Sequence, residues 1–253
     1  MAGCVQTSID NGLLTARLSR GHGNAINPEL ARDLALAFRE AGADPAVRGV
    51  LLAASGKLFC PGLDVQELIV LDRASMERFV IEFAGLILTM YSFEKPVVAA
   101  LHGHAIAGGC VLSLTTDWRV LSNDAMIGLN EIRVGVPLPF GVALILRESV
   151  SPARLEEVAL FGRNYSGEDA LAAGLAHEIH PAEGFAAHCR DRLEKLASRD
   201  ARAFATTKRY LRSATVERIR AHEPSLTYEF LDSWFSSETQ QRLRSIVEEL
   251  RSR

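Results

Sequence analysis

Apolar and polar positions along this chain follow two different periods, which predict short strands alternating with amphipathic helices. The segment Thr7–Leu18 mixes polar and apolar residues around Asn11-Gly12, which predicts two short strands joined by a tight turn. Largely apolar runs at 47–54, 96–101 and 118–122 predict strands that are buried on both faces.

Helical periodicity fills the segments between these runs. Residues 28–42 form the clearest case, because Asn27 can cap a helix that starts at Pro28, and an apolar stripe follows at Leu30, Leu34, Leu36 and Phe38. A second helix is expected within 73–93, and a third from about Gly109. Alternation of strands with amphipathic helices favours the α/β class.

The pattern changes near Ala186, after which only helices are expected. Residues 201–213 and 239–250 are charged, amphipathic and free of glycine. We therefore divide the chain into a core over 1–185 and a helical C-terminal region over 186–253. The apolar face of that region covers either its own core or another subunit.

Composition and charge narrow the class of protein. The chain has 253 residues, 48% of them hydrophobic, which is enough for a large core. A net charge of −3 argues against a general binder of nucleic acid or of membrane surfaces. Residues 96–116 carry no charge, but Pro96, two histidines and three glycines favour a strand, a turn and a buried helix over a membrane span.

The cysteines and the N-terminus point to a reducing compartment. The four cysteines (Cys4, Cys60, Cys110 and Cys189) are scattered without a CxxC pair or zinc-ligand spacing, which is typical of free thiols. The first residues lack the basic and apolar regions of a signal peptide. We expect a cytoplasmic protein.

Two glycine turns and one carboxylate carry the candidate chemistry. Phe59-Cys-Pro-Gly-Leu-Asp64 and Ala105-Ile-Ala-Gly-Gly-Cys110 each follow a predicted buried strand, and together they could aim two backbone N–H groups at one point as an oxyanion hole. Gly128-Leu-Asn-Glu131 adds a carboxylate among apolar residues, which would raise its pKa toward neutral. Taken singly, the glycines are consistent with ordinary turns, and Glu131 with a surface residue paired to Arg133.

Taken together, the two turns, about 45 residues apart, resemble the motifs of the crotonase superfamily, which has the enoyl-CoA hydratase/isomerase fold. The resemblance covers nearly the whole chain. Within the superfamily, the chain most resembles the Δ3,Δ2-enoyl-CoA isomerases of the mitochondrial type. The matching segments are Arg48-Gly-Val-Leu-Leu52, Ile127-Gly-Leu-Asn-Glu131 and Pro139-Phe140. The resemblance implies a spiral of ββα units and C-terminal helices that build a homotrimer or a dimer of trimers. It also implies a coenzyme A thioester as substrate, with no separate cofactor and no metal.

The resemblance also assigns roles to individual residues. It implies that the backbone N–H groups of Leu63 and Gly108 are the oxyanion donors and that Glu131 is the catalytic acid/base. Substrate-binding positions are Ala25, Gly62, Asp64, Gly109 and Asn130. For Asp64 we favour capping of a helix that starts near Val65 over a contact with coenzyme A. We expect His102 and His104 to be structural, since neither has a partner at the spacing of a metal site.

Val111 separates the possible reactions. It occupies the position at which hydratases of this family carry a second glutamate, and Pro139 stands where dienoyl-CoA isomerases carry an aspartate. We therefore count one site carboxylate, Glu131, which favours a shift of the double bond from 3-enoyl-CoA to 2-enoyl-CoA. An enoyl-CoA hydratase is the alternative, and a hydrolase or a decarboxylase is also open. A non-catalytic scaffold or RNA-binding relative is disfavoured by the negative net charge and by Glu131.

Overall fold

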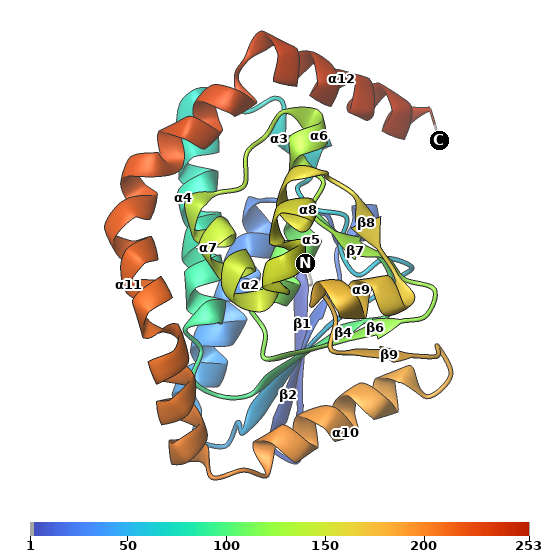
Figure 1. Cartoon of the computed structure of the whole chain (residues 1–253), viewed down its shortest axis with the longest axis vertical. Coiled ribbons are helices and arrows are strands. Elements are labelled where there is room, and N and C mark those ends of the chain that lie inside the picture. Colours follow the sequence, from blue (N-terminus) through green and yellow to red (C-terminus); the bar gives the residue numbers. More distant parts are fainter. Residues whose placement is uncertain (1–2, 253) are drawn as a thin grey trace.

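A six-stranded and a three-stranded sheet with helices around them form the computed structural model, which describes residues 3–252 (Figure 1). The larger sheet has the order β1-β2-β3-β4-β6-β9. Its strands are β1 (Val5–Asp10), β2 (Leu13–Leu18), β3 (Gly49–Ala54), β4 (Val97–Leu101), β6 (Trp118–Ser122) and β9 (Glu178–His180). The smaller sheet joins β5 (Ala105–Ile106), β7 (Ile127–Gly128) and β8 (Asn164–Tyr165).

The register of the larger sheet agrees with the strands predicted from the apolar runs. β1 and β2 pair antiparallel around Asn11 and Gly12, whose φ angles of 50° and 74° are those of a tight hairpin turn. From β2 onward every pairing in this sheet is parallel, and each crossover contains helical segments. β3 and β4 are buried along their whole length, as expected for a parallel sheet that is covered on both faces.

Helices account for most of the remaining chain. The first half contains α1 (Gly21–Asn24), α2 (Pro28–Ala43), α3 (Val65–Leu68), α4 (Arg73–Tyr91) and α5 (Gly108–Leu114). The middle contains α6 (Glu131–Val134), α7 (Phe140–Ser149), the 3₁₀ turn η1 (Pro152–Arg154), α8 (Leu155–Leu160) and α9 (Gly167–Ala173). The C-terminal region contains α10 (Phe185–Ala197), α11 (Ala201–Trp234) and α12 (Ser237–Arg251).

Local signals explain several of these boundaries. Asn27 accepts a hydrogen bond from Leu30 N at 2.9 Å and so caps α2, as predicted. The uncharged segment 96–116 folds into β4, β5 and α5, which confirms the strand, turn and buried helix. Within residues 3–252, no helix has both the length and the apolar character needed to cross a membrane.

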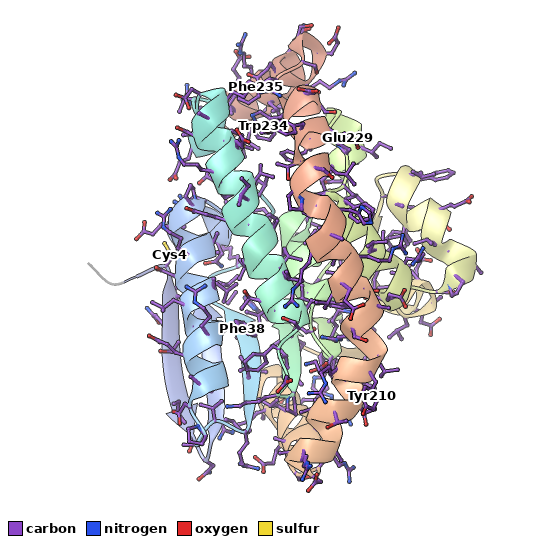
Figure 2. The ribbon with its side chains drawn as sticks, turned by 90° about the vertical axis from the view of Figure 1, so that its left-hand side faces the viewer. Cys4, Phe38, Tyr210, Glu229, Trp234 and Phe235 are labelled. Carbon is purple, nitrogen blue, oxygen red and sulfur yellow. The ribbon has the colours of Figure 1, made fainter. Side chains whose placement is uncertain are left out.

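α11 is much longer than the sequence predicts. The expected helix over 201–213 continues through Pro224 to Trp234. Proline normally ends a helix because it lacks an N–H and crowds the preceding turn. Here α11 packs against α4 and α7, and it contacts α4 on both sides of Pro224, through Arg212 and Asp232. Figure 2 shows α2, α4 and α11 side by side along one face of the molecule.

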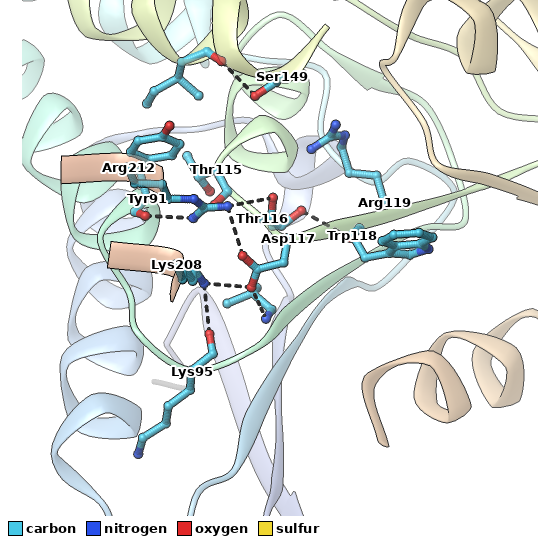
Figure 3. A network of polar contacts seen from close by, with 12 residues as sticks. Tyr91, Lys95, Thr115, Thr116, Asp117, Trp118, Arg119, Ser149, Lys208 and Arg212 are labelled. Carbon is cyan, nitrogen blue, oxygen red and sulfur yellow. Dashed lines mark hydrogen bonds and ion pairs between the residues drawn. The ribbon is translucent and has the colours of Figure 1, made fainter. Parts of the chain in front are cut away.

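A buried ionic cluster fastens α11 to the sheet (Figure 3). Asp117 Oδ2 lies 2.7 Å from Lys208 Nζ, and Asp117 Oδ1 lies 2.9 Å from Arg212 Nη2. Asp117 Oδ2 also accepts from Val97 N, so the same carboxylate ties β4 to α11. All three charged side chains are at most 15% exposed. Burial lowers the pKa of Lys208 to about 8.

Replacing Asp117 by Asn should leave Lys208 and Arg212 buried without their counter-charge. We expect Asp117→Asn to lower the free energy of unfolding by about 3 kcal/mol, because one-sided loss of a buried ion pair is costly. Urea unfolding measures this change. Arg32→Gln is the matched control, since it breaks the exposed pair of Arg32 and Glu82, where we expect about 0.5 kcal/mol. Equal losses of unfolding free energy in the two variants would contradict a stabilising role of the buried ionic cluster.

Candidate active site

A cavity of about 240 Å³ lies between α4, α11, α12 and the loops around α5 and α6. Its wall is mainly apolar, with Phe79, Phe83 and Ile87 from α4 and Phe230 from α11. Six residues singled out from the sequence also line it: Leu63, Gly108, Val111, Asn130, Glu131 and Pro139. Residues that are far apart in the sequence therefore meet at one apolar site.

The turn after β3 leaves the N–H group of Leu63 without a partner. Ile26 N donates to Gly62 O at 2.7 Å, and Asp64 N donates to Ile26 O at 2.8 Å, which forms an isolated parallel bridge. In that bridge Leu63 contributes neither donor nor acceptor. Its N–H has no hydrogen-bond acceptor in the part of the chain that the structure describes. Leu63 itself lines the cavity.

The second turn leaves the N–H group of Gly108 equally free. Ala107 N donates to Gly128 O at 2.8 Å, and Val111 N donates to Ala107 O at 2.9 Å. Gly108 starts α5, where the first N–H groups have no partner within the helix. Across residues 3–252, Gly108 N–H finds no other acceptor. The field of the helix adds positive potential at this group.

The two turns touch each other. A Cβ on Gly62 would lie 2.9 Å from Ala107 Cβ and 3.3 Å from Gly108 N. A Cβ on Gly108 would lie 3.4 Å from Gly62 Cα. Gly62 also has a φ of 108°, which only glycine adopts without strain. Glycine at both positions thus brings two unpaired N–H groups to one end of the cavity, which is the arrangement of an oxyanion hole.

Glu131 provides one titratable group of this cavity. It begins α6, and its Oε2 atom is buried without a hydrogen-bond partner among the described residues. Burial raises the pKa of Glu131 to about 7, although nearby backbone N–H groups act in the opposite direction. A carboxyl group with this pKa exchanges a proton readily near neutral pH.

The C-terminal helix holds α6 in place. Thr239 Oγ1 of α12 donates to Gly135 O, at the end of α6, over 3.2 Å. Gly135 has a φ of 87°, and a Cβ there would lie 2.6 Å from both Thr239 Oγ1 and Arg242 Nη1. α12 also contributes Leu243 and Ile246 to the cavity wall.

Four of the expected substrate-binding residues support the turns instead of lining this cavity. The carbonyl of Ala25 accepts from Arg20 Nη1 at 2.8 Å. Asp64 caps α3 through Glu67 N, as favoured from the sequence, and pairs with Arg20 at 2.8 Å. Gly109 passes Cys60 so closely that a Cβ would lie 2.2 Å from Cys60 O, and Gly62 has the role described above. Binding of coenzyme A by these four residues stays a prediction.

The sequence analysis missed a second carboxyl group in the cavity, so the count of one is wrong. Glu223 of α11 lines the cavity, and its Oε2 accepts a hydrogen bond from Gly141 N, at the start of α7. Burial raises the pKa of Glu223. No local motif could reveal it, because it follows Glu131 by about 90 residues and precedes a proline, which suggested the end of a helix.

Asn24 was also missed. Its Nδ2 donates to Ser55 O at 2.8 Å and to Leu58 O at 3.1 Å, which fixes the loop that leads to the first turn. Asn24 has a φ of 67°, a conformation that asparagine tolerates better than most residues. Its place in Gly23-Asn-Ala-Ile-Asn27 was the available signal.

One group of potential metal ligands occurs in the described chain, formed by Cys4, Glu29 and Asp33. None of them lines the cavity. Asp33 Oδ2 accepts from Cys4 N at 2.7 Å, and the pKa of the Cys4 thiol is raised to about 11, mainly by burial. The thiolate that a metal would require is therefore disfavoured, and we interpret the group as structural.

Comparison with known proteins identifies the family of this chain. The family model for enoyl-CoA hydratase/isomerase matches residues 8–251. The chain belongs to that family. It has the crotonase fold, with an α/β core of mixed sheets and C-terminal helices.

Individual relatives have moderate identity. A protein of Thermus thermophilus is 34% identical over 161 residues, covering 62% of this chain and 63% of that protein, so the match spans less than two thirds of its length. The "Probable enoyl-CoA hydratase" of Rhizobium meliloti is 31% identical over 194 residues, covering 77% of this chain and 74% of the relative.

Solved structures show the same fold. Human mitochondrial Δ3-Δ2-enoyl-CoA isomerase superposes with a TM-score of 0.94 at 24% identity, covering 98% of each chain. The enoyl-CoA hydratase EchA3 of Mycobacterium ulcerans has a TM-score of 0.84 at 27% identity, covering 90% of this chain and 100% of its own. At 24% identity, the similarity to the human isomerase shows a shared fold alone.

The pKa of Glu131 should be visible in the stability of the fold. The pKa of Glu131 in the folded protein is about 7, above its ordinary value of 4.5. Its contribution to the free energy of unfolding is therefore fully present below pH 4.5 and is lost as the pH rises through 7. Glu131→Gln stays neutral throughout. Urea unfolding from pH 4.5 to 8 should show the mutant gaining stability relative to wild type, on the order of 2 kcal/mol. A constant difference over this range would contradict the raised pKa.

Proposed function

We propose that this protein is a Δ3,Δ2-enoyl-CoA isomerase in which Glu131 moves a proton within the bound acyl chain. The observation that supports it most strongly is the set of three groups in one apolar cavity: a carboxyl group with a pKa of about 7 and the two unpaired N–H groups of Leu63 and Gly108. Such a set serves proton transfer next to a thioester carbonyl.

In the proposed reaction the thioester oxygen binds to Leu63 N–H and Gly108 N–H. These donors acidify the C2 protons of a 3-enoyl thioester, and the Glu131 carboxylate removes one of them. The electrons of the C–H bond move into a dienolate, whose oxygen the donors stabilise by about 3 kcal/mol each. The Glu131 carboxylic acid then returns the proton to C4, which leaves the double bond between C2 and C3.

Val111 favours isomerisation over hydration. It lies on α5, is 3% exposed and forms part of the cavity wall, where its side chain can neither orient water nor carry a proton. Isomerisation needs one carboxyl group that reaches two carbons, whereas hydration also requires an activated water. Glu223 keeps an enoyl-CoA hydratase as the second candidate, because it supplies another carboxyl group to the same cavity.

Substitution of Glu131 tests the proposed acid/base. Glu131→Gln should retain acyl-CoA binding but lose isomerisation by at least a factor of about 1,000, since general acid–base catalysis disappears. Ultraviolet absorbance reports the conjugated 2-enoyl thioester formed from 3-enoyl-CoA. The control is Glu82→Gln, an exposed glutamate of α4, which should keep wild-type rates. Substantial activity in Glu131→Gln would place the base elsewhere.

The ratio of two wild-type activities separates isomerase from hydratase. We expect interconversion of 3-enoyl-CoA and 2-enoyl-CoA to exceed hydration of 2-enoyl-CoA by a factor of at least about 100, equivalent to about 3 kcal/mol in the barrier. Val111→Glu should raise hydration above its wild-type level and cost about 1–3 kcal/mol of stability, because it buries a carboxyl group. Comparable wild-type rates for both reactions would favour the hydratase.

We further propose a homotrimer or a dimer of trimers. Large apolar side chains are exposed on two elements, Leu160 and Phe161 at the end of α8 and Tyr210 and Leu211 on α11, each at least 60% exposed. Such side chains are consistent with contacts between subunits.

Light scattering tests the assembly. The intact protein should scatter as a trimer or hexamer, and a chain without 239–253 should form smaller species. This deletion also removes Leu243 and Ile246 from the cavity, so isomerisation should fall with it. An intact protein that is monomeric would exclude the proposed assembly.

We also propose a cytoplasmic location. All four cysteines are free and buried, in agreement with a reducing compartment.

A further inference from the structure

Glu223 is a polar group in an apolar cavity, and the mechanism proposed above does not use it. Its side chain is 8% exposed, on the face of α11 that also presents Ile219 and Phe230 to the cavity. Its Oε2 accepts from Gly141 N. A Cβ on residue 141 would lie 2.9 Å from that oxygen, so glycine permits the approach.

The other carboxyl oxygen of Glu223 is available to a ligand. Among residues 3–252 nothing donates to Oε1, and the described residues that line the cavity include no lysine, arginine or histidine. Capping of α7 therefore accounts for Oε2 of Glu223 but not for Oε1. Glu223 lines the cavity that the acyl chain of the substrate is expected to enter.

Trp234 is a second unpaired polar group of the same wall. It is 2% exposed, and its Nε1 has no hydrogen-bond partner in the described chain. Trp234, which Figure 2 labels, is the last residue of α11 and lies near α12. Eleven residues separate it from Glu223, which corresponds to about 16 Å along the helix. The cavity thus offers polar groups at two places along α11, where a plain hydrocarbon chain would leave Oε1 of Glu223 and Nε1 of Trp234 without a hydrogen bond.

We propose that the cavity accepts acyl chains that carry a hydroxyl group beyond the reacting carbons, and that Glu223 binds this hydroxyl. The proposal rests on the acyl-CoA chemistry of the proposed function and adds a substrate class to it. A thioester held at Leu63 and Gly108 has its reacting carbons at Glu131. The outer carbons then extend toward α7 and α11, where Glu223 lies.

A hydroxyl group fits this carboxyl group better than other polar substituents do. It donates to a carboxylate and accepts from a carboxylic acid, so it pairs with Glu223 in either protonation state. Burial raises the pKa of Glu223, which brings both states within reach. A ketone pairs only with the acid. An ammonium group pairs only with the carboxylate and would lose its hydration among Phe79, Phe83 and Phe230.

Binding of saturated acyl-CoAs tests the proposal without turnover. Isothermal calorimetry would compare octanoyl-CoA with its 5-, 6-, 7- and 8-hydroxy derivatives and with 8-aminooctanoyl-CoA. We expect at least one hydroxy derivative to bind wild-type protein about 10-fold more tightly than octanoyl-CoA. Equal affinities, or tightest binding of the amino compound, would overturn the proposal.

Variants assign the preference to Glu223. Glu223→Leu should bring the affinity ratio of hydroxy to plain chain close to 1. Glu223→Gln can still accept from Gly141 N, so it should fold even if the leucine variant does not, and its ratio should fall about 3-fold because the charge-assisted bond is lost. The matched control is Glu229→Gln, an exposed glutamate of the same helix (Figure 2), which should keep the wild-type ratio. A wild-type ratio in both Glu223 variants would overturn the assignment.

The outcome is separable from that of the proposed function. Isomerisation of 3-octenoyl-CoA without any preference among the saturated ligands would contradict only the role of Glu223. A clear preference for a hydroxy ligand without isomerisation would contradict only the proposed reaction. Absence of binding by every acyl-CoA would contradict both.

Discussion

The contact between two glycine turns is the constraint on which the site depends. Backbone N–H groups in a folded protein are almost always paired, so two unpaired ones at a single point must be held there by their surroundings. Here Ile26 forms hydrogen bonds with Gly62 O and Asp64 N, on either side of Leu63. The N–H group of Ala107, just before Gly108, donates to Gly128 O. A side chain on Gly62 or Gly108 would separate the turns. The unpaired groups thus follow from the packing of the turns, and residues 3–252 provide no acceptor for them.

The C-terminal helices complete what the turns begin. The core supplies the unpaired N–H groups of Leu63 and Gly108 and the carboxyl group of Glu131, whereas α11 and α12 close the cavity over them with Phe230, Trp234 and Leu243. α11 is fastened to the sheet by Asp117, and α12 to α6 by Thr239. Because Glu131 starts α6, the same helix contact that closes the cavity also orients the titratable group. The C-terminal helices and the side chain of Glu131 are therefore linked through short chains of contacts.

The sequence predicted what depends on local pattern and on the known motifs. Strands β3, β4 and β6, the cap at Asn27 and the grouping of Leu63, Gly108 and Glu131 in one cavity all followed from it. The length of α11 was missed because Pro224 normally ends a helix, and here tertiary packing outweighs that preference. Glu223 was missed for the related reason that only the full course of α11 brings it to the cavity. Contacts between distant segments left no spacing that could be read locally.

Two carboxyl groups share the cavity, but their surroundings differ. Glu131 lines the same cavity as Leu63 and Gly108, and its Oε2 has no hydrogen-bond partner among the described residues. Glu223 has one oxygen fixed by Gly141 N, which favours its charged form and opposes the effect of burial. It is thereby suited to hold a ligand in one orientation, whereas Glu131 is suited to exchange a proton. Backbone N–H groups oppose the effect of burial at both glutamates, but only at Glu223 does the donor, Gly141 N, come from a different helix.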